Sequence, residues 1–315
     1  MKVQLLAAAG VLALLGGAAH AQTVVNGYAG AGYDYTGGTD KFTETSEGTT
    51  TSKIDQNTNG YYFDGAISVP VTSLIGVQGD LAYGNSATHL KETFSSGSPD
   101  QFGFHDDGTV ATVHVFARTA DWLAGAFVGE NDSGEGTLKG GGVEGQYYMG
   151  PFTFEGSLGA ATQSLGFDFF GSGFQPHMIA VRVGARYFVS PDFVVGVHAG
   201  YMDGDTTFHE DSSLSEDFQA PGLFTVGVGG EYKVPGQPVT VTLNYEHGDS
   251  STHVTDNEGL DEHLKLIGDD VSVGVRWNFG GSLLERDRHG ASLPTFKDLF
   301  GGQFGSGLLE TLFEA

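Results

Sequence analysis

The feature that most constrains the fold is a succession of segments in which apolar residues occupy every second position. Val271, Val273, Val275, Trp277 and Phe279, for example, alternate with small or polar residues. This two-residue period is typical of β-strands with one apolar face. The sequence predicts about twelve such strands, at Thr23 to Tyr35, Gly60 to Val69, Ile75 to Asn85, Thr109 to Thr119, Trp122 to Glu130, Gly140 to Tyr148, Phe152 to Gln163, His177 to Phe188, Phe193 to Asp203, Leu223 to Lys233, Val239 to His247, and Asp270 to Phe279.

The links between these segments alternate in length. Short links cover residues 70–74, 120–121, 149–151, 189–192 and 234–238. The intervening links are longer and polar, and they cover residues 36–59, 86–108, 131–139, 164–176, 204–222 and 248–269. Strands that cross a membrane as a barrel are joined by short periplasmic turns on one side and longer external loops on the other. The alternation therefore predicts an even number of strands, with both ends of the strand series on the periplasmic side.

A second, charge-bearing face recurs on most of the predicted strands. Arg182 and Arg186 oppose the apolar face of residues 179–187, and Arg276 opposes that of residues 271–279. This pattern favours a polar lumen over the core of a soluble β-sandwich or propeller, which remains the alternative. We therefore predict an all-β fold, a transmembrane antiparallel up-and-down β-barrel of about twelve strands with long external loops and short periplasmic turns.

The first 21 residues have the pattern of an export signal. Lys2 precedes an apolar run from Leu5 to Leu15, and Ala19-His20-Ala21 forms a small-x-small cleavage site. The run is too short for a spanning helix, and no later segment contains 18 consecutive apolar residues. We expect a signal peptide at 1–21, a barrel at 22–279 and a periplasmic C-terminal extension at 280–315.

The composition excludes several classes of function. The chain has 39 acidic and 14 basic residues and a net charge of −25, so it is an improbable nucleic-acid binder. It has no cysteine, which excludes disulfides, thiolate metal sites and a cysteine nucleophile. The 51 glycines follow no three-residue period and occur with 23 Phe and 12 Tyr, a combination that favours barrel strands over collagen or a disordered linker.

The segment Val271-Ser272-Val273-Gly274-Val275-Arg276-Trp277-Asn278-Phe279 resembles the aromatic-terminated last strand of porin-like Gram-negative outer-membrane barrels. The resemblance extends over the chain from residue 22 to Phe279. It implies an outer-membrane location and an assembly signal, read by the barrel-assembly machinery, at Val271, Val273, Val275, Trp277 and Phe279. The chain departs from the pattern because 36 residues follow Phe279.

The predicted strand parity places a set of charged side chains inside the barrel. We expect opposite charges on neighbouring strands to pair, namely Asp80 with Arg118, Glu155 with Arg182 and Arg186, and Glu246 with Arg276. Such a network can brace the wall, or it can act as a lining that selects solutes by charge. The predicted lining residues are Asp64, Asp80, His114, Arg118, Glu144, Glu155, Arg182, Arg186, His198, Glu231, Lys233, Glu246 and Arg276.

The glycines predicted to face inward have two interpretations. Gly76, Gly159, Gly184, Gly196, Gly227, Gly229 and Gly274 can leave room for a bore, or they can mark places where large side chains lean across. A twelve-stranded barrel is intermediate in width between small filled barrels and wide porins. The expected bore is therefore narrow.

Catalytic and metal-binding patterns are weak. The mid-strand histidines His114 and His198 have no recognisable serine partner, so we expect no enzyme, and a barrel-embedded lipid hydrolase remains an alternative. Seven histidines and many acids lie in the links and strand tips, but His209-Glu210-Asp211 and Asp261-Glu262-His263 lack an established ligand spacing. We expect neither a metal nor a cofactor.

The tail after Phe279 contains two short apolar clusters. Ser292 and Pro294 resemble the start of a helix, and Leu293, Phe296, Leu299 and Phe300 have helical spacing. A second cluster follows Gly301-Gly302. The tail can be an unstructured periplasmic extension, a plug of the barrel itself, or a docking segment for a periplasmic partner. The sequence leaves these three open.

The functional prediction is a porin-like channel for passive diffusion of small hydrophilic solutes or ions. A non-conducting structural or adhesive barrel is the alternative. The expected partners are outer-membrane lipids, lipopolysaccharide and the barrel-assembly machinery. External acidity predicts a modest preference for cations.

Overall fold

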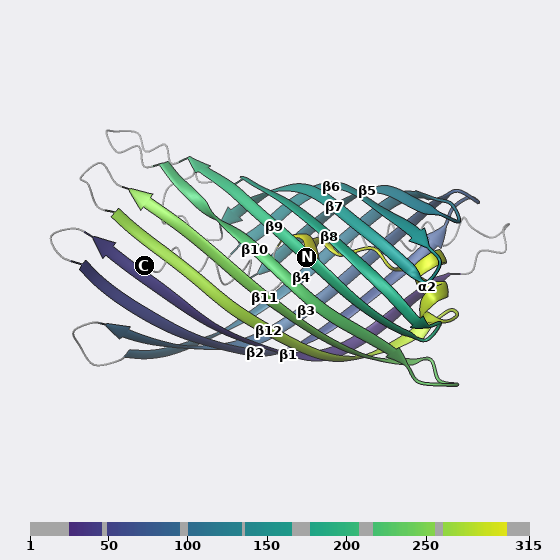
Figure 1. The fold of residues 1–315 in the computed structure, drawn as a ribbon, viewed down its shortest axis with the longest axis horizontal. Helices are drawn as coiled ribbons and strands as arrows, with labels where there is room; N and C mark the ends of the chain where they lie inside the picture. Colours follow the sequence, from purple (N-terminus) through teal and green to yellow (C-terminus); the bar gives the residue numbers. More distant parts are fainter. Residues whose placement is uncertain are drawn as a thin grey trace.

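The computed structural model describes residues 25–45, 49–94, 100–133, 136–165, 177–207, 217–255 and 261–300, and the predicted signal peptide lies outside them. Twelve antiparallel strands form one closed barrel (Figure 1). The strands are β1 (Asn26–Thr45), β2 (Thr49–Pro70), β3 (Ile75–Phe94), β4 (Asp100–Arg118), β5 (Trp122–Ser133), β6 (Gly136–Met149), β7 (Phe152–Leu165), β8 (His177–Ser190), β9 (Phe193–Thr207), β10 (Asp217–Lys233), β11 (Val239–Thr255) and β12 (Asp261–Phe279).

The barrel closes between its first and last strands. Strand β1 pairs with β12 from Gly27 opposite Phe279 to Thr45 opposite Asp261, so the sheet has no free edge. The side chains of Val271, Val273, Val275, Trp277 and Phe279 are exposed on the outer face, as are Val181, Val183 and Tyr187 of β8. The predicted barrel, its strand number and its outward parity are thus confirmed.

The strands are longer than the sequence predicts at one end of the barrel. Short links at residues 71–74, 119–121, 150–151, 191–192 and 234–238 define what we call the turn end. At the opposite, hairpin end, β1 continues to Thr45 and β2 starts at Thr49, where the sequence predicts a loop over residues 36–59. The polar ends of β1 and β2 continue to pair there through their backbones, because backbone hydrogen bonds do not require an alternating apolar pattern of side chains.

The tail turns back into the barrel after β12. Gly280 has φ +112, which a residue with a side chain rarely adopts, and it starts the turn. Helix α2 (Leu283–His289) lies at the turn end, and helix α3 (Phe296–Leu299) lies within the lumen against β4, β5, β7 and β8 (Figure 1). Residues 282–300 therefore fold back against the barrel, and residues 301–315 lie outside the described part of the chain.

Among the described residues, no helix is long and apolar enough to cross a membrane.

Candidate functional site in the barrel lumen

The inner wall carries the charged side chains selected from the sequence. Glu155 is the clearest case, because it lies 3.0 Å from Arg182 and 2.9 Å from Arg186 on the adjacent strand. This predicted pairing is confirmed. Glu155 is opposite Gly184 in the β7–β8 register, so an arginine lies two residues away on either side. The residues that project from the inner face are Asp64, Asp80, His114, Arg118, Glu144, Glu155, Arg182, Arg186, His198, Glu231, Lys233, Glu246 and Arg276.

Two predicted ion pairs are wrong, and the register explains both. Asp80 is opposite Thr112 on β4, six positions from Arg118, and Arg118 instead donates to the carbonyl oxygen of Gly290 at 3.2 Å. Glu246 is opposite Asp270 on β12, also six positions from Arg276. A separation of six residues along a strand is about 20 Å. The two-residue period of a strand tells which charged residues share the inner face. It does not tell how far along the neighbouring strands they lie from each other.

Arg276 belongs to a second charged group near the turn end. Its guanidinium lies 2.6 Å from Asp64 and 3.0 Å from Glu231. Glu231 also accepts a hydrogen bond from Arg286 of α2. Lys233, on the same strand, donates to the carbonyl oxygen of Gly281 at 2.5 Å. The wall and the tail are therefore parts of one polar network.

Both mid-strand histidines are bound to carboxylates. His114 is completely buried, with Nδ1 2.8 Å from Glu144 and Nε2 2.9 Å from Asp80. His198 Nε2 lies 2.7 Å from Glu246. Neither ring nitrogen of His114 is therefore open to a serine hydroxyl.

Helix α2 is attached to the wall on several sides. Asp287 accepts a hydrogen bond from Thr153 at 2.6 Å and lies 2.9 Å from Arg186. Arg288 donates to the carbonyl oxygens of Gly150 and Phe152 at 2.9 and 3.0 Å. A capping box between Ser282 and Glu285 satisfies the first backbone N–H groups of the helix. These contacts hold α2 across the turn end.

The segment between the helices is held by two glutamines of the wall. Gln78 accepts from the backbone N–H of Ser292 at 3.1 Å, and Gln146 donates to the carbonyl oxygen of Ser292 at 3.2 Å. Leu293 packs in a buried cluster with Phe116, Leu123 and Tyr148. The extended backbone of the tail is thus satisfied inside the barrel.

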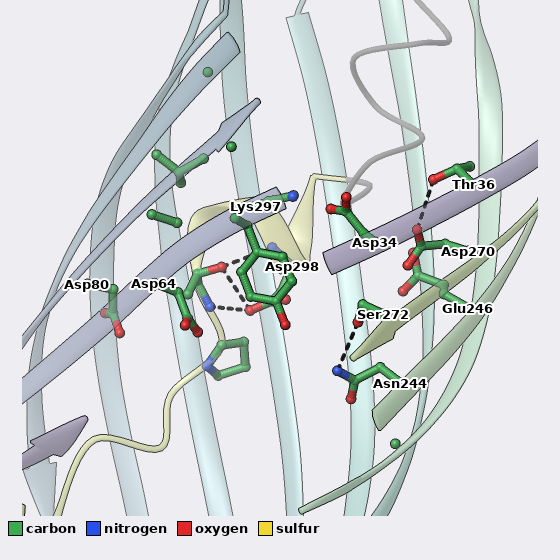
Figure 2. Close-up of a pocket in the computed structure, with 18 of the residues that line it drawn as sticks. Asp34, Thr36, Asp64, Asp80, Asn244, Glu246, Asp270, Ser272, Lys297 and Asp298 are labelled. Carbon is green, nitrogen blue, oxygen red and sulfur yellow. Dashed lines mark hydrogen bonds between the residues drawn. The ribbon is translucent and has the colours of Figure 1, made fainter. Parts of the chain in front are cut away.

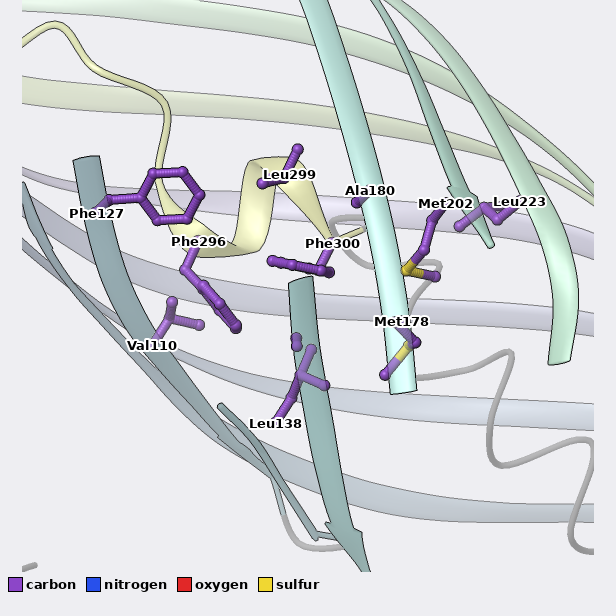
Figure 3. Packing of buried hydrophobic residues seen from close by; sticks show 11 residues of the cluster. Val110, Phe127, Leu138, Met178, Ala180, Met202, Leu223, Phe296, Leu299 and Phe300 are labelled. Atoms are coloured by element: carbon purple, nitrogen blue, oxygen red, sulfur yellow. The ribbon is translucent and has the colours of Figure 1, made fainter. Parts of the chain in front are cut away.

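Helix α3 inserts apolar side chains into the inner wall. Phe296 is fully buried, and its backbone N–H donates to Thr112 Oγ1 at 2.9 Å. Leu299 and Phe300 are also buried (Figure 3). The wall side chains in this cluster, which come from β4 to β10, are Val110, Phe127, Leu138, Ala161, Met178, Ala180, Met202 and Leu223. This sector of the lumen is apolar, in contrast to the charged lining predicted from the sequence.

A cavity of about 510 Å³ lies beside the tail. Figure 2 shows Lys297 and Asp298 of α3 on one side of this cavity and Asp34, Asp270 and Glu246 on the other. Asp270 accepts a hydrogen bond from Thr36 at 2.8 Å. The cavity continues toward the hairpin end, where Gln56, Thr88 and Phe104 line it. The tail thus forms one side of this cavity.

Asp298 is kept charged by its surroundings. Burial within the barrel raises the pKa of its carboxyl group, but the nearby Arg182 and the hydrogen bonds from Thr295 outweigh this effect and hold the pKa below its usual value. Asp298 accepts from the Thr295 backbone N–H at 2.7 Å and completes the cap of α3. The charged face of α3 is therefore directed at the cavity, and its apolar face is directed at the wall.

Residues of two kinds lie at the site but outside the set predicted from the sequence. Asp34 and Asp270 line the cavity. They alternate with the outward-facing Tyr33, Tyr35 and Val271, so the two-residue period could have identified them as inward-facing. The tail residues carry no such signal, because nothing in a two-residue period says where a segment after the last strand will pack. Among the described residues, no three His, Asp or Glu side chains gather as a metal site.

The comparisons with known proteins agree with this architecture. No family model and no curated relative matches the sequence. An outer-membrane channel from Pseudomonas putida F1 superposes with a TM-score of 0.58 at 12% identity, covering 80% of this chain and 96% of that one. The NanC porin (TM-score 0.38, 12% identity, 75% and 98% covered) and the P. putida toluene transporter TodX (TM-score 0.41, 9% identity, 81% and 90% covered) are also similar. The closed barrel and its superposition on the P. putida F1 channel show that the chain has the fold of an outer-membrane β-barrel.

Proposed function

We propose that this protein is an outer-membrane channel for passive diffusion of small hydrophilic solutes, with a modest preference for cations. The observation that carries the proposal is the cavity inside the barrel, which is lined by Asp34, Glu246 and Asp270. A polar, water-accessible lumen behind an apolar outer face is the arrangement of a diffusion channel. The shared fold with the P. putida channel supports the proposal at the level of architecture.

The orientation of the barrel follows from its two ends. Short turns face the periplasm in bacterial barrels, and longer hairpins face outward. In this orientation the cavity extends toward the outside, where Gln56 and Phe104 line it. Helix α2 then lies at the periplasmic mouth. A solute would meet the acidic cavity before it meets the tail.

A non-conducting structural barrel is the second candidate, and one observation favours it. The tail fills part of the lumen and is bonded to the wall from α2 to α3. A lipid hydrolase receives no support from the mid-strand histidines, because His114 has a carboxylate at each ring nitrogen and His198 pairs with Glu246.

Conductance in a planar bilayer tests the proposal. We expect the refolded full-length protein to open at least intermittently, and the full-length Phe296→Ala variant, which loses the fully buried ring of α3, to conduct more. Silence of both proteins at every applied voltage would contradict the channel and favour the structural barrel. Reversal potentials under a salt gradient would then measure the charge preference.

A further inference from the structure

The inner wall beside α3 is shaped to receive the tail. A Cβ atom on Gly129 would lie 2.6 Å from Cβ of Phe296, and one on Gly159 would lie 2.8 Å from a methyl group of Leu299. Real Cβ atoms do not approach other atoms so closely, so a side chain at either position would displace the tail. The tail therefore takes the place that wall side chains occupy in a small, filled barrel.

At the height of α3, side chains of the tail fill the space beside Gly129 and Gly159 of the wall. Around α3 the inner face of β5 to β8 combines Gly129 and Gly159, beside which tail side chains lie, with the larger apolar side chains of Phe127, Leu138 and Met178. Small residues leave the space beside them open unless another segment fills it. Removal of α3 would join this space to the cavity of about 510 Å³.

The two parts of the tail are held differently. Helix α2 is held by charged contacts, through Asp287 with Arg186 and through Arg286 with Glu231. Helix α3 is held mainly by the burial of Phe296, Leu299 and Phe300. Its charged side chains, Lys297 and Asp298, already face the cavity, so α3 can move into that space without exposing a buried charge.

We propose that residues 282–300 form a displaceable plug that closes the barrel in the conformation described, and that conduction requires α3 to leave the inner wall. This inference rests on the proposed channel function and assigns its regulation to the chain's own C-terminal segment. The plug has α2 as its base and α3 as its moving part.

A reversible disulfide in the full-length protein tests the plug directly. The chain has no cysteine, so Gly129→Cys with Phe296→Cys introduces a single pair. The Cβ atom of residue 296 and a Cβ on residue 129 lie 2.6 Å apart, and a disulfide needs about 3.5 to 4.5 Å, so a shift of about 1 Å is sufficient. We expect the oxidised protein to conduct little, because the disulfide ties α3 to β5. Reduction removes this tie and should raise the mean conductance roughly tenfold, since the freed α3 also lacks the buried ring that holds it to the wall.

The single variants Gly129→Cys and Phe296→Cys are the matched controls, and neither should respond to reductant. Equal conductance of the double variant before and after reduction would overturn the plug while leaving the channel intact. Conductance that falls on reduction would also overturn it.

A second readout does not depend on conduction. Thr112 is 1% exposed beneath the backbone of Phe296, whereas Asn244 is exposed in the cavity. In full-length single-cysteine variants, we expect a small water-soluble methanethiosulfonate to label Asn244→Cys rapidly and Thr112→Cys slowly. Adding Phe296→Ala should speed the labelling of Thr112→Cys several-fold.

Labelling of Asn244→Cys without any labelling of Thr112→Cys, with or without Phe296→Ala, would show a fixed tail and overturn the plug. Labelling of Thr112→Cys in a protein that never conducts would support the displaceable tail and contradict the channel. The failure of one proposal is thus distinguishable from the failure of the other.

Discussion

Arg186 is the side chain that joins the inner wall to the tail. It lies 2.9 Å from Glu155 of β7 and 2.9 Å from Asp287 of α2, and all three side chains are largely shielded from water. Its removal would leave two carboxylates close together without their shared cation. We predict that Arg186→Met lowers the free energy of unfolding by about 3 kcal/mol. The thermal unfolding midpoint of the refolded protein in detergent measures the effect.

Lys139 is the matched control for this substitution. Its side chain is 57% exposed and 3.7 Å from Glu130 on the neighbouring strand. Exposed pairs of this kind contribute little, so Lys139→Met should change the free energy of unfolding by no more than about 0.5 kcal/mol. Equal losses in the two variants would show that Arg186 does not act through its buried partners.

Two consecutive aspartates allow a clean test of which charges select ions. Asp270 faces the cavity, whereas Asp269 is exposed and accepts hydrogen bonds from Tyr245 and His247. Strand parity places the two side chains on opposite sides of the wall. We predict that Asp270→Asn reduces the cation preference in reversal-potential measurements, whereas Asp269→Asn leaves it nearly unchanged. The reverse order would show that charges outside the lumen govern selection.

At the scale of elements, helix α2 depends on its first turn. Ser282 accepts a hydrogen bond from the Glu285 backbone N–H at 3.2 Å, and Glu285 accepts one from the Ser282 N–H at 2.7 Å. A helix of seven residues has few other sources of stability. Loss of such a cap costs about 1 kcal/mol, a factor of roughly five in an equilibrium. We therefore predict that Ser282→Ala opens α2 about fivefold more often.

Limited trypsin digestion of the folded protein measures this opening. Arg286 donates a hydrogen bond to Glu231, and Arg288 donates to backbone carbonyl oxygens of the wall. Cleavage after either arginine therefore requires α2 to leave the wall. Ser282→Ala should increase the rate of cleavage there, whereas Ser73→Ala, in the exposed 71–74 turn, should not. An unchanged rate would mean that the wall contacts and not the cap hold α2.

The strands show what a sequence pattern determines and what it leaves open. Apolar alternation located the membrane-crossing part of every strand, because lipid on the outside imposes a strict two-residue period. It underestimated the length of β2, which starts at Thr49, because the polar strand pairs at the hairpin end follow no such period. It also paired Asp80 with Arg118, since register depends on the hydrogen bonding of whole strands, which parity does not specify.

At the scale of the whole molecule, the tail was the least predictable part. The helical spacing of Leu293, Phe296, Leu299 and Phe300 indicated an apolar surface, but not its partner. The partner is formed by apolar side chains of β4 to β10, together with Gly129 and Gly159, which come together only when the barrel closes. The inward glycines had two interpretations, and the structure shows large side chains leaning over them, as Phe116 does over Gly76 and His198 over Gly227.

The summed charge of the molecule leads to a prediction about salt. The chain has a net charge of −25, and acids line the cavity, so the potential within the lumen should attract cations. Mobile ions screen charges beyond about 10 Å at 0.1 M salt and about 3 Å at 1 M. We predict a cation preference at 0.1 M KCl that declines toward none at 1 M, measured as reversal potentials under matched gradients.

The direction and the salt dependence of this preference separate two physical origins. A field summed over many acids acts at long range and is lost at high salt. A preference that survives at 1 M would instead require short-range contact between the ion and individual carboxylates such as Asp270, where screening is weak. Anion preference at 0.1 M would contradict both origins, because it would require Arg182, Arg186 and Arg276 to dominate a lumen in which carboxylates neutralise them.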